Sequence, residues 1–155
     1  MRIKLLLASA VLVVSACTKA DTPAADTSMP AATETPQAPI TLASVAGTWN
    51  FNVMGQSSDS VVATNVATFT EDPAGWSFRF PGGPAIPIRN VTVAGDSITY
   101  ESGPFASAVR KGMQVSNRVA MTLRDGNLVG NVIARYQTTR PDSVMQFRLT
   151  GTRAQ

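Results

Sequence analysis

Apolar residues recur at every second position through much of this chain, and this period of two constrains the fold more than any other feature. The clearest run lies at residues 115–124, and shorter runs lie at 49–53, 76–80 and 145–150. Side chains that alternate in this way place one face of an extended strand in a core and the other face in water. The pattern is typical of antiparallel sheets with one buried face.

The alternating runs and the turns between them predict about eight strands. Asp and Ser recur together where runs begin, and Asp125-Gly126-Asn127 is a hairpin signal. The stretch 103–112 is the one long connection, and Gly130 is expected to mark a bulge or tight bend inside a strand. The predicted strands are 47–54, 60–70, 75–80, 86–94, 97–102, 113–124, 127–139 and 143–152.

These strands predict an all-β domain over residues 40–155, built as an antiparallel meander. Closing such a sheet removes the exposed edge strands, which would otherwise invite pairing with other chains. We therefore expect a closed or nearly closed up-and-down β-barrel. A strongly curled open sheet or a two-sheet sandwich is the alternative.

The N-terminal segment does not share the alternating pattern of residues 40–155. Arg2 and Lys4 precede a short apolar run that ends at Ala16 and is too brief to span a bilayer, so residues 1–16 are expected to be a signal peptide. The sequence Val14-Ser15-Ala16-Cys17 resembles the lipobox of bacterial lipoproteins. That resemblance implies cleavage before Cys17 and lipidation of its sulfur; an ordinary secretory signal is the alternative.

Residues 17–39 are expected to form the lipidated cysteine and a disordered tether rich in Ala, Thr and Pro. This segment contains no aromatic and no β-branched aliphatic residue, and a core is built largely from these types. The lipoprotein resemblance implies export and an N-terminal lipid in a membrane of the cell envelope. Thr18 stands where some lipoproteins carry the Asp that retains them at the inner membrane, so we expect an outer-membrane protein facing the periplasm.

The sequence offers no catalytic constellation. It contains no His and a single Cys, which removes the commonest general base and, if Cys17 is acylated, any thiol nucleophile. Basic residues are scattered rather than interleaved with stacking aromatics, so no nucleic-acid partner is expected. We expect neither enzymatic activity nor a cofactor or metal site.

The start of the domain resembles the lipocalin and calycin barrels. A short helical turn is followed by Gly47-Thr48-Trp49, which matches their Gly-x-Trp at the head of the first strand. The resemblance implies that Trp49 closes one barrel end and that a basic residue of the last strand lies across it. Arg153 is the first choice for that residue and Arg148 the second.

Two functions remain open. The barrel interior either holds a small apolar or amphipathic ligand or is filled by side chains, in which case the outer surface contacts envelope partners. Arginines at 79, 118, 124, 135 and 148 would project outward and suit an anionic partner or cross-strand ion pairs. The expected ligand-lining residues are Trp76, Phe78, Phe80, Tyr100, Met121, Tyr136, Met145 and Phe147, with the two tyrosines as polar handles.

Overall fold

A computed structural model describes residues 39–155. The expected signal peptide, Cys17 and all of the expected tether except its last residue lie outside the described residues. Within residues 39–155, no helix has both the length and the apolar character needed to cross a membrane.

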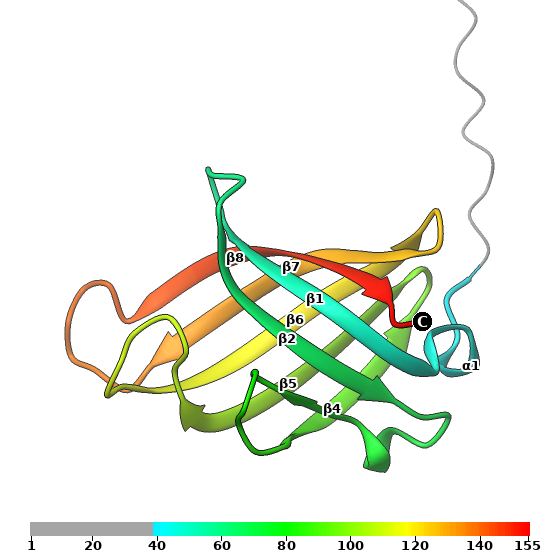
Figure 1. The fold of residues 1–155 in the computed structure, drawn as a ribbon, viewed down its shortest axis with the longest axis horizontal. Coiled ribbons are helices and arrows are strands. Elements are labelled where there is room, and N and C mark those ends of the chain that lie inside the picture. The colour runs from blue at the N-terminus through cyan, green and yellow to red at the C-terminus, as the bar shows by residue number, and fades with distance from the viewer. Residues whose placement is uncertain (1–38) are drawn as a thin grey trace, which may run out of the picture. The chain divides into compact units, whose positions relative to one another are not determined.

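The domain is an all-β closed barrel of eight antiparallel strands, as the alternation predicts (Figure 1). Each strand pairs with the next one in sequence, and β8 returns to pair with β1. The strands are β1 (Gly47–Gly55), β2 (Val61–Phe69), β3 (Ser77–Arg79), β4 (Ile86–Ala94), β5 (Ser97–Ala106), β6 (Gln114–Arg124), β7 (Asn127–Tyr136) and β8 (Val144–Arg153).

One part of the barrel wall is weakly paired. Strand β3 has three residues and shares only two register pairs with β4, Ser77 with Pro87 and Phe78 with Ile86. A 3-10 turn, η1 (Pro73–Gly75), precedes β3 and begins where the Asp72 side chain accepts a hydrogen bond from the Ala74 amide. The predicted strand 75–80 is therefore too long, because capping and Pro73 impose a turn on its first residue.

Three further details of the prediction are wrong. Strand β7 ends at Tyr136, so residues 137–139 of the predicted strand 127–139 belong to the β7–β8 loop. Residues 103–106 continue β5, so the connection to β6 covers only residues 107–113; Gly103 and Pro104 interrupt the ladder as a bulge rather than ending the strand. Gly130 marks no bulge, because its pairing with β6 and β8 runs through it without a shift. A Cβ at this position would stand 2.1 Å from the Ala120 carbonyl oxygen, so glycine permits the close approach of β6.

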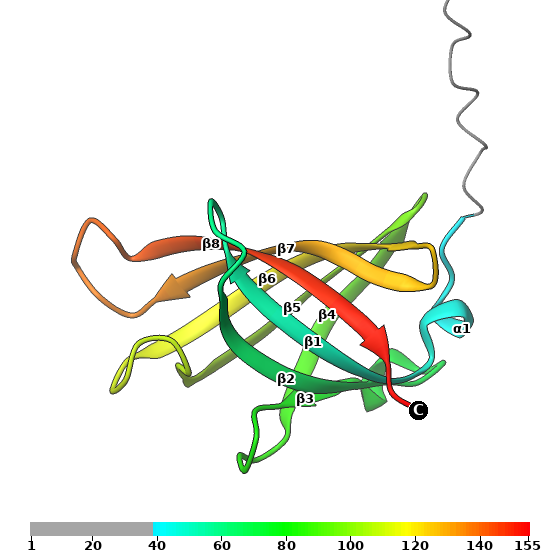
Figure 2. The same cartoon turned by 45° about the horizontal axis from the view of Figure 1, so that its top comes forward.

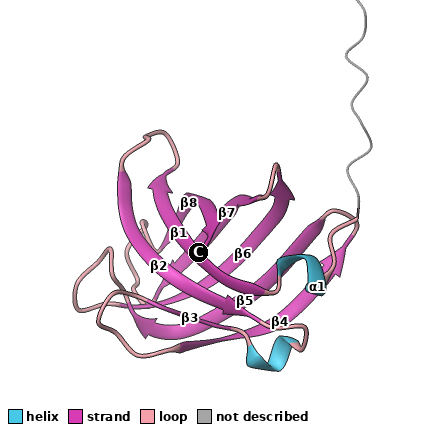
Figure 3. Ribbon diagram, turned by 45° about the vertical axis from the view of Figure 1, so that its right-hand side comes forward, coloured by secondary structure: helices cyan, strands magenta, loops and turns pink. Residues whose placement is uncertain are grey.

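The two barrel ends differ. A four-residue helix, α1 (Leu42–Val45), packs at one end beside the C-terminus, whereas the β5–β6 and β7–β8 loops lie at the other (Figures 1 and 3). We call these the closed end and the open end. Side chains near the closed end fill the interior; the largest that are fully buried are Trp49, Trp76, Phe69, Ile98, Met121, Leu128 and Val45.

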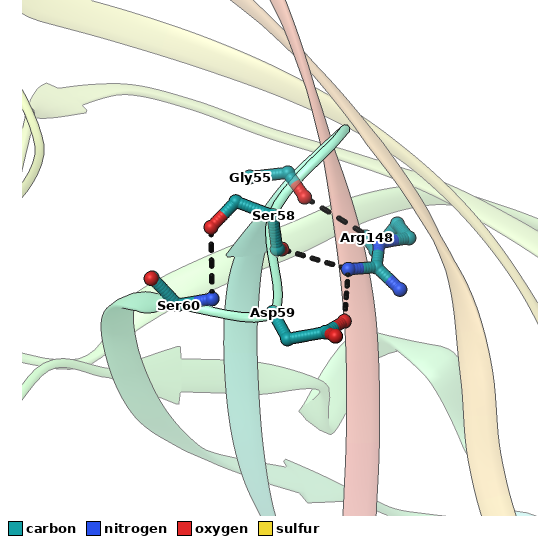
Figure 4. A network of polar contacts seen from close by, with 5 residues as sticks. All are labelled: Gly55, Ser58, Asp59, Ser60 and Arg148. Atoms are coloured by element: carbon teal, nitrogen blue, oxygen red, sulfur yellow. Dashed lines mark hydrogen bonds and ion pairs between the residues drawn. The ribbon is translucent and has the colours of Figure 1, made fainter.

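Arg148 fastens the β1–β2 turn to β8 (Figure 4). Its guanidinium donates to the carbonyl oxygens of Gly55 and Ser58 and forms an ion pair with Asp59 at 2.7 Å. A second view shows this turn projecting from the barrel beside β8 (Figure 2). Arg148 thus holds a turn and does not lie across Trp49.

Candidate ligand-binding cavity

Trp49 closes one end of the barrel. Its side chain is fully buried, and its indole Nε1 donates to the Val45 carbonyl oxygen at 2.8 Å. The guanidinium carbon of Arg153 lies 4.6 Å from the ring centroid, in cation–π range. Arg153 also donates to the carbonyl oxygens of Ala46 at 2.6 Å and Ser44 at 3.0 Å, which ties the last strand to the end of α1.

Gly47 makes room for this arrangement. Its φ of +131° is disfavoured for residues that carry a Cβ, and a Cβ there would stand 2.7 Å from Nη1 of Arg153. The three residues expected at a barrel end, Gly47, Trp49 and Arg153, therefore lie together. Their arrangement supports the fold, and none of the three lines the cavity in the other half of the barrel.

The open half of the barrel contains a cavity of about 60 Å³ that opens to solvent. Its wall is mostly aromatic and aliphatic, and it contains no Asp, Glu, Lys or Arg side chain. The lining residues include Phe51, Phe78, Phe80, Tyr100, Phe105, Val119, Tyr136 and Phe147.

Five of the eight side chains predicted to line a ligand site border this cavity: Phe78, Phe80, Tyr100, Tyr136 and Phe147. The other three lie elsewhere. Trp76 packs against Phe69 with ring centroids 4.3 Å apart, and its Nε1 donates to the Thr70 carbonyl oxygen at 2.6 Å. Met121 is fully buried opposite Gly130, and Met145 is a half-buried residue packed against the core. The alternation of apolar residues predicts which side chains face the interior, but not how far along the barrel axis each one lies.

The alternation of apolar residues does not indicate the polar part of the cavity wall. Ser102 on β5 and Asn117 on β6 are cross-strand partners, and both line the cavity. Asn117 falls between Val115 and Val119 in the alternating run, so its inward position could have been found from the sequence. For Ser102 the signal was weaker, because Gly103 and Pro104 mimic the end of a strand.

Two oxygen atoms in this wall have no hydrogen-bond partner among the described residues: Ser102 Oγ and Asn117 Oδ1. Ser102 is only 4% exposed. Tyr100, one step deeper along β5, is buried, and desolvation raises the pKa of its hydroxyl far above the usual value of 10. The hydroxyl is therefore neutral, and this part of the wall is polar without being charged.

The β5–β6 loop, residues 107–113, covers part of the mouth with Ser107, Ala108 and Val109. Arg110 in this loop pairs with Asp142 of the β7–β8 loop at 2.5 Å, and its guanidinium lies 4.7 Å from the Tyr136 ring centroid. Because Tyr136 also lines the cavity, Arg110 connects the loop to the rim of the site.

The outer surface carries most of the arginines. The side chains at positions 79, 118, 124 and 135 are exposed, and Arg148 is half-buried. Arg89, Arg118 and Arg135 border an outer depression of about 380 Å³, which is also lined by Glu101 and by Ser102 and Asn117 of the cavity wall. Among residues 39–155, no group of three or more His, Cys, Asp or Glu side chains is placed to hold a metal ion.

These features define a class of protein: a small closed β-barrel with one packed end and an apolar cavity at the other. Comparison with protein-family models, curated proteins and solved structures found no match. The function of this chain is therefore inferred from its cavity and its outer surface.

Proposed function

We propose that this protein is a lipid-anchored envelope protein whose lipocalin-like barrel binds a small apolar or amphipathic ligand at its open end. The observation that carries the proposal is the cavity lined by Phe, Tyr, Val and Ala side chains and open to solvent. Sites for small molecules are concave, mostly apolar, and contain a few polar groups that orient the ligand. The open half of this barrel has that composition.

The volume of the cavity limits the ligand. About 60 Å³ accommodates a few heavy atoms, whereas drug-sized ligands occupy a few hundred cubic ångströms. A longer ligand would insert one end and leave the rest in the mouth, beside Phe80 and Val109. Phe80 is half-buried and Val109 is exposed, so both can contact such a ligand.

The anchoring part of the proposal depends on Cys17 and on the signal-like sequence before it. Two or three acyl chains hold a protein on a membrane, since each buried methylene contributes about 0.8 kcal/mol. We expect Cys17→Ala to abolish the mass of the lipid and to release the protein from the membrane fraction. Retention of the variant in that fraction would contradict lipid anchoring at Cys17.

Native mass spectrometry tests ligand binding. The protein is expressed as the full chain with Cys17→Ser, so that it is exported without a lipid, and is purified from the soluble periplasmic fraction of its host without added ligand. We expect additional mass that dissociates on denaturation and is absent from a variant with a filled cavity, Ala63→Leu. Finding only the bare chain mass, before and after incubation with envelope lipid extract, would contradict the proposal.

A second function is favoured by the filled half of the barrel and by the arginine-rich outer surface. In this alternative the interior is a structural core, and residues such as Arg89, Arg118 and Arg135 contact an envelope partner. Arg forms paired hydrogen bonds with carboxylates and phosphates, so the partner would be anionic. Replacing these three arginines with Gln would then abolish partner capture, whereas Ala63→Leu would leave it unchanged.

A further inference from the structure

One stretch of the cavity wall is polar, although apolar side chains surround it. Along β5 and β6 the inward cross-strand pairs are Tyr100 with Val119, then Ser102 with Asn117, then Phe105 with Val115. All six side chains line the cavity. The middle pair therefore places two short polar groups between apolar neighbours, part of the way down the wall.

This polar pair costs stability in the free protein. Ser102 Oγ and Asn117 Oδ1 are both shielded from solvent and make no hydrogen bond among the described residues. A buried polar atom without a partner loses its hydration without compensation, and an apolar replacement of similar shape removes that penalty. Groups that destabilise a fold in this way are frequent at binding sites, where a ligand supplies the missing partner.

The same wall disfavours a charged ligand group. No acidic or basic side chain lines the cavity, so a carboxylate or ammonium placed inside would be desolvated without a counter-charge. Arg110, in the loop beside the mouth, is already paired with Asp142 and stacked on Tyr136. A hydroxyl or an amide, by contrast, both donates and accepts hydrogen bonds and suits either orientation of the Asn117 amide.

We propose that the ligand is an uncharged amphiphile whose hydroxyl or amide group inserts toward Ser102 and Asn117. Its apolar part extends to the mouth past Phe80 and Phe105, whose ring centroids are 5.9 Å apart. This inference rests on the proposed function, because it assigns the chemistry of a ligand in the same cavity. It adds that recognition comes from neutral hydrogen bonding inside the barrel rather than from an ion pair at the rim.

A series of six-carbon probes tests the ligand class. Residues 17–155 with Cys17→Ser are titrated with hexan-1-ol, hexanamide, hexanoate, hexylammonium and hexane, and binding is followed by amide chemical shifts of cavity residues. We expect the alcohol and the amide to bind about tenfold or more tightly than either ion, and more tightly than hexane. Equal or tighter binding of an ion or of hexane would overturn the ligand class and leave the binding function standing. Absence of binding by every probe would overturn both.

Two variants test the residues. Asn117→Leu and Ser102→Ala should each weaken hexan-1-ol binding about three- to tenfold, which corresponds to loss of one hydrogen bond, and leave hexane binding equal or stronger. Matched controls are Asn131→Leu and Ser116→Ala, at positions outside the cavity lining. Asn117→Leu should also raise the Tm of the ligand-free protein.

Unchanged alcohol affinity in both variants would overturn the assignment. So would a lower Tm in Asn117→Leu together with equal losses for hexan-1-ol and hexane, since that combination indicates a purely structural role. Ser102→Ala removes only one hydroxyl and decides the question if Asn117→Leu fails to fold.

Discussion

At the scale of single residues, Arg153 combines three interactions at the closed end. It lies over the Trp49 ring and donates to two carbonyl oxygens at the end of α1. These contacts join β8, β1 and α1, so one side chain connects the last strand of the barrel to the first. The guanidinium is planar and has five donors, which allows it to stack and to donate at the same time.

We expect Arg153→Ala to lower the free energy of unfolding by about 1–2 kcal/mol, from loss of the cation–π contact and two hydrogen bonds. Arg153→Lys keeps the positive charge but lacks the planar guanidinium with its several donors, so it should lower the free energy of unfolding by a smaller amount. Urea denaturation measures both. Arg124→Ala, an exposed arginine on β6, is the control, and equal losses at positions 153 and 124 would contradict the special role of Arg153.

Gly47 and Arg153 should show energetic coupling. Gly47→Ala introduces a Cβ 2.7 Å from Arg153 Nη1 at a positive φ, so we expect it to destabilise the barrel by more than about 1 kcal/mol. Gly82→Ala also places a Cβ at positive φ but in open space, and it should cost less. In an Arg153→Ala background the steric part of the Gly47→Ala penalty should disappear; strictly additive losses in this double-mutant cycle would contradict the contact.

At the scale of elements, the two loops at the open end are joined by one ion pair. The Arg110 guanidinium donates hydrogen bonds to both the carboxylate and the backbone carbonyl oxygen of Asp142. The hydrogen bond from Arg110 lowers the pKa of the Asp142 carboxyl below its ordinary value of 3.8. A lowered pKa in the folded state means that the pairing stabilises the loops above pH 3.8 and is lost as pH falls through the folded-state pKa.

We therefore expect amide hydrogen exchange in residues 107–113, relative to the intrinsic rate, to increase when the pH is lowered from 5 to 3. Asp142→Asn should show the faster exchange already at neutral pH and lose the pH dependence. Asp125→Asn, at an exposed hairpin position without a side-chain partner among the described residues, is the control. Unchanged amide exchange of residues 107–113 in Asp142→Asn would show that Arg110 holds the loop through its contact with Tyr136 alone.

The shortest strand should be the first part of the wall to open. β3 has three register pairs with β2 and two with β4, whereas β6 and β7 share ten. Few cross-strand hydrogen bonds correspond to a low free energy of local opening. We expect the paired amides of residues 77–79 to exchange faster than those of β6 and β7 in native-state hydrogen exchange. Comparable protection in β3 and β6 would contradict this order.

The sequence predicts the strands well where alternation is long and turns are marked by Asp, Ser and Gly. The run around Val119 and Met121 fixes β6, and Asp125-Gly126 fixes the hairpin that follows. The prediction is wrong where a Gly or Pro residue is compatible with two different local structures. Gly103 and Pro104 indicate a loop but form a bulge, and Gly130 indicates a bulge but permits close strand packing.

The candidate site is predicted only in part, for a related reason. Alternation assigns Phe78, Phe80 and Phe147 to the interior, and they do line the cavity. Their depth depends on strand tilt and register around the closed barrel, which no local pattern specifies. Met121 therefore packs near the closed end although its pattern is the same. The polar pair Ser102 and Asn117 was not predicted, because the alternation of apolar residues does not distinguish an inward polar residue from an interruption of the pattern.

At the scale of the whole molecule, the barrel divides into a packed half and a half with a cavity. The chain as described begins at the closed end, where the Ile40 amide donates to the Gly95 carbonyl oxygen at 3.2 Å, and the C-terminus lies nearby (Figure 1). The mouth lies at the opposite end, so neither described terminus crosses it. Burial of apolar side chains in the packed half stabilises the fold. That stabilisation offsets the cost of the unpartnered polar atoms in the half with the cavity.

This division predicts that filling the cavity separates stability from binding. Ala63 is a half-buried residue of the cavity wall, and Ala63→Leu adds three carbon atoms toward the open volume. Since each buried methylene contributes about 0.8 kcal/mol, we expect a higher Tm and at least tenfold weaker binding of hexan-1-ol. Ala120→Leu adds the same atoms on the exposed face of β6 and should change neither quantity appreciably. A gain in stability with unchanged binding would place the ligand outside the barrel and favour the outer arginine surface, whereas a loss of stability would show that the wall cannot accept added volume.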